Sequence, residues 1–174
     1  KAYEEIINRI AWFADGTAKW GGMRGILYSS NTTKANATTG AWLGGVTTPD
    51  QIIADVNKGI QAIRDLTLNV EEPDTFIMPS AHYAHIASTP RSSTSDKTIL
   101  EWLQKVHPGV TFGWANELKD VNPVPSTGVA SNTNCAIIYK KSSEKLTLEI
   151  PSPFEQFAPQ ARNLEFVVPA HGRV

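Results

Sequence analysis

The stretch TPDQIIADVNKGIQAIRDL, residues 48–66, decides the fold of this chain because it predicts one long helix. Thr48 is a good N-cap, Pro49 suits the first helical position, and Gln51 stands where it completes a capping box. Six aliphatic residues recur at helical spacing, which leaves the polar side chains largely on the other faces: Ile52, Ile53, Val56, Ile60, Ile63 and Leu66. We therefore predict an amphipathic rod of about 27 Å.

The composition predicts a globular, turn-rich protein. The chain has 174 residues, enough for one substantial core or two small subdomains, and it contains 11 Pro and 12 Gly. Its 16 Lys and Arg residues oppose 17 Asp and Glu residues, so the net charge is -1. This balance argues against tight binding of nucleic acid through phosphate neutralisation. No run has the apolar length of a membrane span, so we expect no membrane partner.

Shorter elements are expected on both sides of the long helix. An apolar stripe from Tyr3 to Ala14 predicts a first helix, which Asp15-Gly16 ends. Residues 29–47 read as an exposed loop with Trp42 as its large anchor. Further along, the pattern predicts strands at 75–78, 110–112 and 164–168, a helix at 80–87 capped by Ser80, a helix at 96–106 that starts at Ser95, proline-marked crossings at 122–128 and 151–159, and a hairpin between 136–140 and 146–150. Strands and helices mix without regular alternation, so the predicted fold class is α+β.

Two histidines are the first candidates for chemistry. His82 and His85 stand three residues apart on a predicted helix, a spacing that can hold a metal ion on one face. No carboxylate follows at a supporting position, and His107 and His171 lie far away in the sequence. A helix surface or a packed pair explains them better than a metal site does. A small metal-dependent enzyme that uses His82, His85 and a carboxylate remains the rival hypothesis from another class.

Other motifs also give little support for catalysis. The glycine-rich run 21–25 lacks the lysine of a P-loop and reads as a turn. The serines at 92–95 show no nucleophile-elbow pattern. Cys135 is alone in an apolar run, where a buried small hydrophobe is the expected role. We therefore predict no enzyme: no catalytic, cofactor-binding or metal-ligating residues, and no cofactor.

Several segments form a diffuse pattern, in a fixed order, over nearly the whole chain: Ile10–Gly16, Gly22–Tyr28, the helix from Pro49, Pro73–Pro79 followed by Tyr83 and Ile86, Leu148–Phe157, and Arg162–Phe166. This order of segments resembles that of the major capsid proteins of tailed bacteriophages. Specifically, the chain resembles the encapsulin-like, phage-related subgroup of the Hong Kong 97-like capsid fold.

This resemblance implies a division into domains. Residues 1–75 would form part of a peripheral domain, with the first helix, the loop and a spine helix at 49–66. Residues 76–150 would form a mixed α/β axial domain, and 151–174 would return as a strand into the peripheral domain. The N-terminal arm of the family and much of its extended loop have no counterpart here, so the chain is expected to be a fragment of a longer protein. The residues of the self-crosslinking members cannot be matched, so no covalent chemistry is implied.

The resemblance also implies a function and partners. The chain would be a structural subunit that self-assembles, as pentamers and hexamers, into an icosahedral phage or prophage shell around DNA. Its contact with the packaged DNA would be non-specific, and its location would be the virion, with assembly in the cytoplasm of the bacterial host. An encapsulin-type compartment that encloses cargo enzymes is the alternative with the same fold.

Overall fold

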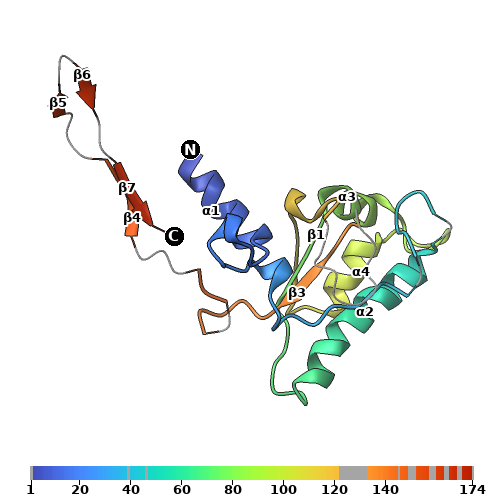
Figure 1. Cartoon of the computed structure of the whole chain (residues 1–174). Helices are drawn as coiled ribbons and strands as arrows, with labels where there is room; N and C mark the ends of the chain where they lie inside the picture. The colour runs from blue at the N-terminus through green and yellow to red at the C-terminus, as the bar shows by residue number, and fades with distance from the viewer. Residues whose placement is uncertain are drawn as a thin grey trace. The chain divides into compact units, whose positions relative to one another are not determined.

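The computed structural model describes residues 2–38, 40–45, 47–121, 133–144, 146–148, 152–156, 160–162, 165–167 and 170–173. The chain divides into two compact units, one made of residues 33–145 and the other of 1–32 together with 146–174 (Figure 1). The crossing predicted at 122–128 lies outside the described residues.

A three-stranded sheet lies at the centre of the unit 33–145. Strand β1 (Thr75–Met78) is its middle strand, with β2 (Thr111–Trp114) parallel on one side and β3 (Ile137–Tyr139) antiparallel on the other. Phe76 of β1 pairs with Phe112 and Ile138 in register. The strand predicted at 75–78 is confirmed, and the one predicted at 110–112 begins one residue later and runs further.

The long helix is confirmed with the predicted ends. Helix α2 spans Pro49–Leu66, and both bonds of the capping box are present: the Gln51 N–H donates to Thr48 Oγ1, and the Thr48 N–H donates to Gln51 Oε1 at 2.8 Å. Its aliphatic stripe is buried at Ile52, Ile53, Val56 and Ile60. Local sequence and tertiary burial agree here, which explains why the prediction succeeds.

Two further helices begin differently from the prediction. Helix α3 (Ser80–Ser88) has Pro79 at its N-cap, and the Ser80 hydroxyl contacts Asn116 Oδ1 at 2.6 Å instead of capping. Helix α4 (Ile99–Val106) begins later than Asp96 because Thr98 and Glu101 form a complete capping box. Two reciprocal bonds there compete successfully with the single Ser95 hydroxyl, which accepts from the Lys97 N–H in a turn.

The predicted hairpin between 136–140 and 146–150 is wrong. Strand β3 pairs with β1, and the described residues 146–148 form no strand and are exposed. A tertiary bond helps to fix the chain just after β3, because the Lys141 N–H donates to Asp74 Oδ1 at 2.8 Å next to the start of β1. Strand β3 therefore pairs with β1, which is distant in the sequence, and not with the nearby segment 146–150 that the predicted turn indicated.

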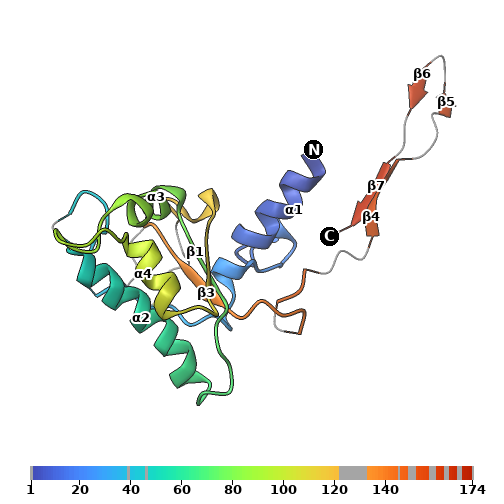
Figure 2. The same cartoon turned by 180° about the vertical axis from the view of Figure 1, so that it is seen from behind.

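One hydrophobic core fills this unit. Helices α2 and α4 run beside the sheet (Figures 1 and 2). The buried cluster takes residues from α2, β1, α3, α4 and β2, while Trp42 and Ile138 pack against it from the loop and from β3. Residues 49–66 and 76–145, which the sequence prediction divided between two domains, thus contribute to one unit. Their assignment to a peripheral or an axial domain stays a prediction.

The other unit begins with helix α1 (Ala2–Phe13), as predicted, and a tight turn follows it. Asp15 and Arg24 form an isolated bridge around the short 3-10 helix η1 (Ala18–Trp20), and a second one, η2 (Ile26–Tyr28), comes after it. Gly25 lies against the backbone of α1: a Cβ atom there would stand 2.7 Å from the Ile10 carbonyl oxygen. This close approach explains the glycine, and the run 21–25 is a turn as predicted.

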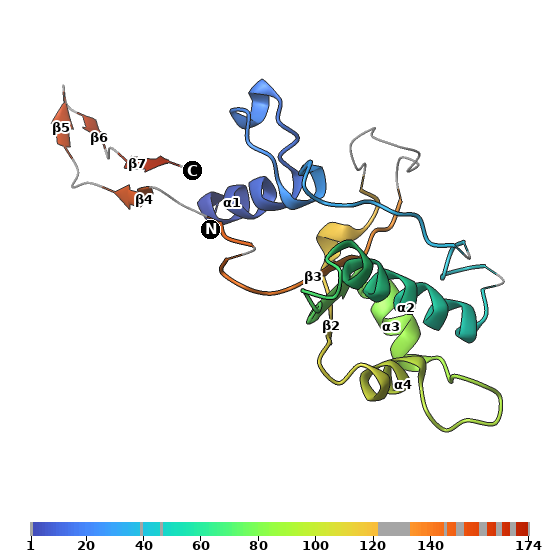
Figure 3. The ribbon, with the colours of Figure 1, turned by 90° about the horizontal axis from the view of Figure 1, so that it is seen from below.

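The C-terminal residues of this unit form two antiparallel ladders (Figure 3). Strand β4 (Ser152–Gln156) pairs with β7 (Ala170–Arg173), and β5 (Gln160–Arg162) pairs with β6 (Glu165–Val167). Part of the crossing predicted at 151–159 is therefore strand, which period-2 alternation did not reveal between prolines. The strand predicted at 164–168 matches β6 in its described residues.

Candidate functional site

The described residues hold no constellation of metal ligands. No three His, Cys, Asp or Glu side chains within the described ranges gather around a common point. Cys135 is a free, half-buried thiol, and burial raises its pKa, so it has the character of a small hydrophobe and not of a nucleophile. In the same residues, no helix has the length and apolarity that a bilayer crossing requires.

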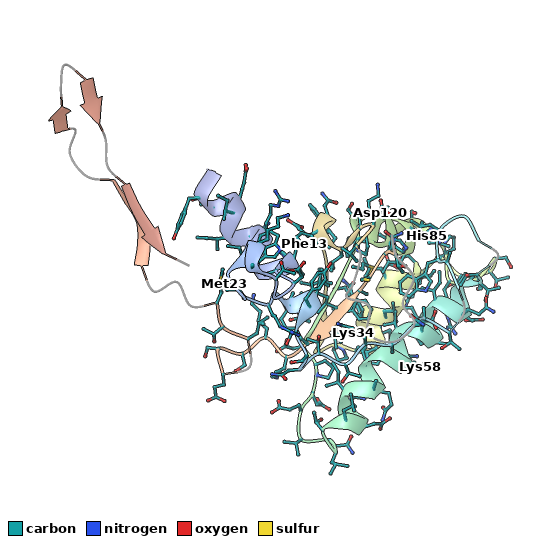
Figure 4. All side chains as sticks on the ribbon, in the orientation of Figure 1. Phe13, Met23, Lys34, Lys58, His85 and Asp120 are labelled. Atoms are coloured by element: carbon teal, nitrogen blue, oxygen red, sulfur yellow. The ribbon has the colours of Figure 1, made fainter. Side chains whose placement is uncertain are left out.

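The two histidines of the metal hypothesis lie on α3 with different neighbours. The His82 ring packs at a tilt against Trp42, with ring centroids 6.1 Å apart, and its buried Nδ1 has no hydrogen-bond partner. Burial, and then the charge of His85, lowers the pKa of His82. His85, labelled in Figure 4, places Nδ1 3.3 Å from the Thr89 hydroxyl. Packing against an aromatic ring therefore accounts for His82, and no described third ligand joins the pair.

The loop before α2 is fastened to that helix by one carboxylate. Asp55 accepts from the Thr38 N–H at 3.0 Å through Oδ1 and from Trp42 Nε1 at 3.1 Å through Oδ2. Lys58, one turn further along α2 (Figure 4), donates to the Thr38 hydroxyl at 2.7 Å. The long loop is thereby held along the helix at two points. A loop fixed in this way presents a defined surface despite its Thr, Asn and Gly composition.

The other end of α2 presents apolar side chains to solvent. The exposed fractions are 62% for Leu66, 85% for Leu68 and 79% for Val70. The backbone here is closed by the Asn69 N–H, which donates to the Arg64 carbonyl at 2.7 Å. Thr67 adds two bonds, because its hydroxyl donates to the Ile63 carbonyl at 2.8 Å and accepts from the Glu71 N–H at 3.2 Å. Backbone and Thr67 hydrogen bonds therefore fix this turn although the side chains of Leu66, Leu68 and Val70 are exposed.

A pocket of about 330 Å³ is lined by Arg64 and Glu72, the residues on either side of this turn, among others. Arg64 pairs with Glu72 at 3.5 Å, and Lys140 pairs with Asp74 at 3.5 Å, so its charges balance. His107 contacts Asn57 Oδ1 at 2.7 Å, and burial, followed by the charge of Arg64, lowers the pKa of its ring. The lining comprises Arg64, Glu72, Pro73, Asp74, Val106, His107, Pro108, Gly109, Val110 and Lys140.

Asp74 links the pocket to the sheet. Its carboxylate accepts from the Lys141 N–H and from the Thr75 hydroxyl, each at 2.8 Å. These two bonds, in that order, and then the nearby Lys140 charge lower the pKa of Asp74. The charged form of this carboxylate therefore holds the end of β3 against the start of β1.

Sequence reasoning missed both the Asp55 clamp and the exposed turn after α2. Asp55 sits on the polar face of an amphipathic helix, where a solvated carboxylate is the default reading, and its partners lie 13 and 17 residues away in the chain. The Asn at position 69 gave a weak signal for a left-handed turn at the helix end. Exposure of Leu68 and Val70 had no sequence signal, because their neighbours are set by tertiary packing.

Comparison with solved structures shows the fold. The chain matches one from the structure titled "The capsid of Myoviridae Phage XM1" with a TM-score of 0.74 and 20% identity over 97% of this chain. The match covers 54% of the phage XM1 chain, so this chain spans about half the length of that protein. The chain therefore has a mixed α/β fold similar to a phage capsid fold. No curated protein matches the chain in sequence.

Comparison with family models extends this result to the whole sequence. The model described as "Major capsid protein" matches residues 1–174. This agrees with the resemblance that the order of segments suggested, from the first helix to the C-terminal strands. The chain belongs to the major capsid protein family.

Proposed function

We propose that this chain is part of a structural subunit that assembles with copies of itself into the icosahedral shell of a phage or prophage. The observation that carries the proposal is the family match over residues 1–174, which the similarity to a phage capsid chain supports. The shell would consist of pentamers and hexamers and would enclose DNA. The subunit would reside in the virion after assembly in the cytoplasm of the bacterial host.

The surface of the described residues suits such a role. Large apolar side chains stand exposed in both units, including Ile6 on α1 and the residues after α2. Side chains of this kind supply association energy when copies pack together. The net charge of -1 fits a wall that confines DNA through non-specific contact, because tight phosphate binding needs an excess of cations.

The Hong Kong 97-like details extend this proposal. In that scheme α2 would be the spine helix of a peripheral domain, with an axial domain from residue 76 to 150. Helix α2 also has a second structural role, because its buried stripe is part of the core of the unit 33–145. A map of the assembled particle would decide the matter. A spine helix would lie in a peripheral domain apart from the sheet β2-β1-β3, whereas a core helix would pack on that sheet within one domain.

The direct test is electron microscopy of the full-length protein that contains this chain. We expect closed shells, or rings of five and six copies, when it is expressed alone or with the products of neighbouring genes. A full-length product that stays monomeric under all assembly conditions would contradict the proposal. Nuclease-protected DNA inside the particles would support a capsid, whereas a co-purifying enzyme cargo without DNA would favour the encapsulin-type compartment.

A further inference from the structure

The turn at the end of α2 forms an apolar knob, which we define as Leu66, Leu68 and Val70. All three side chains are mostly exposed, and Leu68 is the most exposed of the large apolar residues in the described chain, at 85%. Figures 1 and 2 show this end of α2 and the turn after it pointing away from the sheet of its own unit. Three neighbouring aliphatic side chains on a turn are a costly thing to leave in water.

The backbone of the knob is both fixed and strained. Leu68 has φ 50° and Asn69 has φ 61°, in the left-handed region. Asn tolerates that region, but for a branched Leu it is unfavourable, and glycine would relieve the strain. The hydrogen bonds of Thr67 and Asn69 hold the turn in this form nevertheless. A strained backbone conformation in an exposed apolar turn suggests a functional role for that conformation.

The pocket described above is the neighbour of the knob on the same surface. Arg64 and Glu72 both line the pocket, and the knob lies between them in the chain. Apolar lining comes from Pro73, Val106, Pro108 and Val110, with Val106 45% exposed. Knob and pocket are thus an apolar projection and a neighbouring recess whose lining mixes apolar and charged side chains.

The charges around the pocket indicate what kind of molecule could cover it. Arg64 and Lys140 contribute two cations, and Glu72 and Asp74 contribute two carboxylates, in pairs 3.5 Å apart. Such a balanced rim offers no net attraction to a phosphate backbone. It is self-complementary, however, because a second copy presents the same two signs of charge. A two-fold arrangement would let each copy insert its knob into the pocket of the other in one contact.

We propose that the α2 knob of one copy docks into the Val106 pocket of a second copy, reciprocally, as one of the contacts between subunits. This inference rests on the proposed self-assembly and specifies a surface for it. On docking, Leu68 leaves water and meets Val106 and the prolines of the pocket. The contact also stabilises the strained turn, which the free subunit holds with its own hydrogen bonds alone.

Disulfide trapping between copies tests the contact directly. In full-length protein carrying Cys135→Ser, one preparation bears Leu68→Cys and another bears Val106→Cys, and the two are mixed before assembly. Any cysteine outside residues 1–174 is replaced by serine as well, so each chain carries a single cysteine and only bonds between copies can form. We expect a mixed dimer on non-reducing gels of assembled material. Trp114→Cys in place of Val106→Cys is the matched control, since Trp114 is more exposed, at 58%, and does not line the pocket.

The mixed dimer should exceed the control several-fold. Equal trapping at Trp114, or no trapping at Val106 in particles that have formed, would overturn the docking. If the unmodified protein forms no particles at all, the proposed function fails, and trapping is then scored on protein in solution. A mixed dimer there would retain the contact as a dimer interface, and its absence would reject it.

A second variant separates docking from folding. Leu68→Asn removes the aliphatic side chain but places a residue at φ 50° that accepts the left-handed region, so the fold should melt at the same or a higher temperature. Its assembly should need about tenfold more protein, as expected when one Leu no longer becomes buried. Trp114→Asn should leave the assembly threshold closer to that of the unmodified protein. An unchanged threshold for Leu68→Asn would reject the knob.

Discussion

The two ends of α2 are built in opposite ways. At its N-terminal end, Thr48 and Gln51 close a capping box, and Asp55 holds the preceding loop through Thr38 and Trp42. At the C-terminal end the chain turns through two left-handed residues and exposes three aliphatic side chains. One end directs its polar groups inward to the loop, and the other directs apolar groups outward to water.

This difference teaches how one helix can serve both folding and contact. The buried stripe at the middle fixes the helix in the core, so neither end has to hold it there. The N-terminal end stabilises a loop that has few large side chains of its own. The C-terminal end can then expose aliphatic side chains to water, because burial of the stripe in the core offsets the unfavourable free energy of that exposure. The experiments below test each part of α2 in turn, from the largest expected effect to the smallest.

The middle of α2 should carry most of the stability. Ile60 is 1% exposed, so Ile60→Ala should lower the free energy of unfolding by about 2–5 kcal/mol through lost burial and a cavity. Val70→Ala at the exposed end, with 79% of the residue accessible, is the control and should change it by about 0.5 kcal/mol or less. Urea titration of both variants measures the difference. Similar losses at the two positions would show that the apolar end is packed in the isolated chain.

The Asp55 clamp should rank next. Asp55→Ala removes the acceptor of two hydrogen bonds and should cost about 1–3 kcal/mol, because bonds to a charged group are the stronger ones. Hydrogen exchange at the Thr38 amide should accelerate in the same variant, which reports release of the loop. Asp65→Ala is the matched control near the other end, where the carboxylate accepts one bond from Gln61 Nε2 at 2.8 Å.

That control should cost about 0.5 kcal/mol at most, since the pair lies on an exposed helix face. It should leave Thr38 exchange unchanged. If Asp55→Ala is as mild as Asp65→Ala, the loop is held by its packing of Trp42 and not by the carboxylate.

Sequence reasoning predicted α2 to the residue because all its signals are local. The cap, the Pro at the first position and the 3.6-residue stripe lie within the helix itself. Helix α4 follows the same rule, although its predicted start at Ser95 is wrong. Thr98 and Glu101 form the capping box, three residues further along the chain. In both helices the capping residues next to the first turn determine where the helix begins.

The features that escaped prediction depend on distant partners. The strand β3 reads as half of a hairpin in sequence, but Asp74, far upstream, fixes the chain beyond it through the Lys141 N–H. The Asp55 clamp and the apolar turn at Leu68 likewise depend on what lies across space. The candidate contact surfaces are thus the part that needed coordinates, whereas the order of segments alone had indicated the family.

A glycine in the middle of α2 gives a test of smaller net effect. Gly59→Ala should gain up to about 1 kcal/mol of helix propensity. The new Cβ, however, would stand closer to Ile138 Cδ1 of β3 than van der Waals contact allows, so that overpacking should offset or outweigh the gain. Removing that terminal methyl with Ile138→Val in the same chain should restore the benefit.

A double-mutant cycle in urea measures this coupling between α2 and the sheet. We expect Gly59→Ala to be more favourable in the Ile138→Val background by about 1 kcal/mol, within the range for residues in contact. Additive effects would mean that the Ile138 side chain turns aside freely. In that case the middle of α2 is less tightly packed than its burial indicates.

The smallest expected effect concerns acid, just beyond the C-terminal end of α2. The pKa of Asp74 in the folded chain lies below its ordinary value, through the Lys141 N–H and then the Thr75 hydroxyl. The unfolded state therefore binds the proton more readily, and the stabilisation by Asp74 is present above about pH 4 and fades as the pH falls through the lower folded value. Asp74→Asn should make unfolding stability less dependent on pH in this acidic range.

Asp15 provides the matched comparison in the other unit. Its pKa is also lowered, first by the Thr17 hydroxyl and then by the Thr17 N–H, in the turn after α1. Asp15→Asn should flatten the acid dependence of that unit, and the double variant should combine both effects because the two sites share no partners. If Asp74→Asn leaves the acid slope unchanged, the junction of β1 and β3 is held by its backbone ladder alone. The C-terminal end of α2 would then be positioned by the buried stripe of the helix and not by the carboxylate of Asp74. In that case only the N-terminal end of α2 would depend on a carboxylate, that of Asp55.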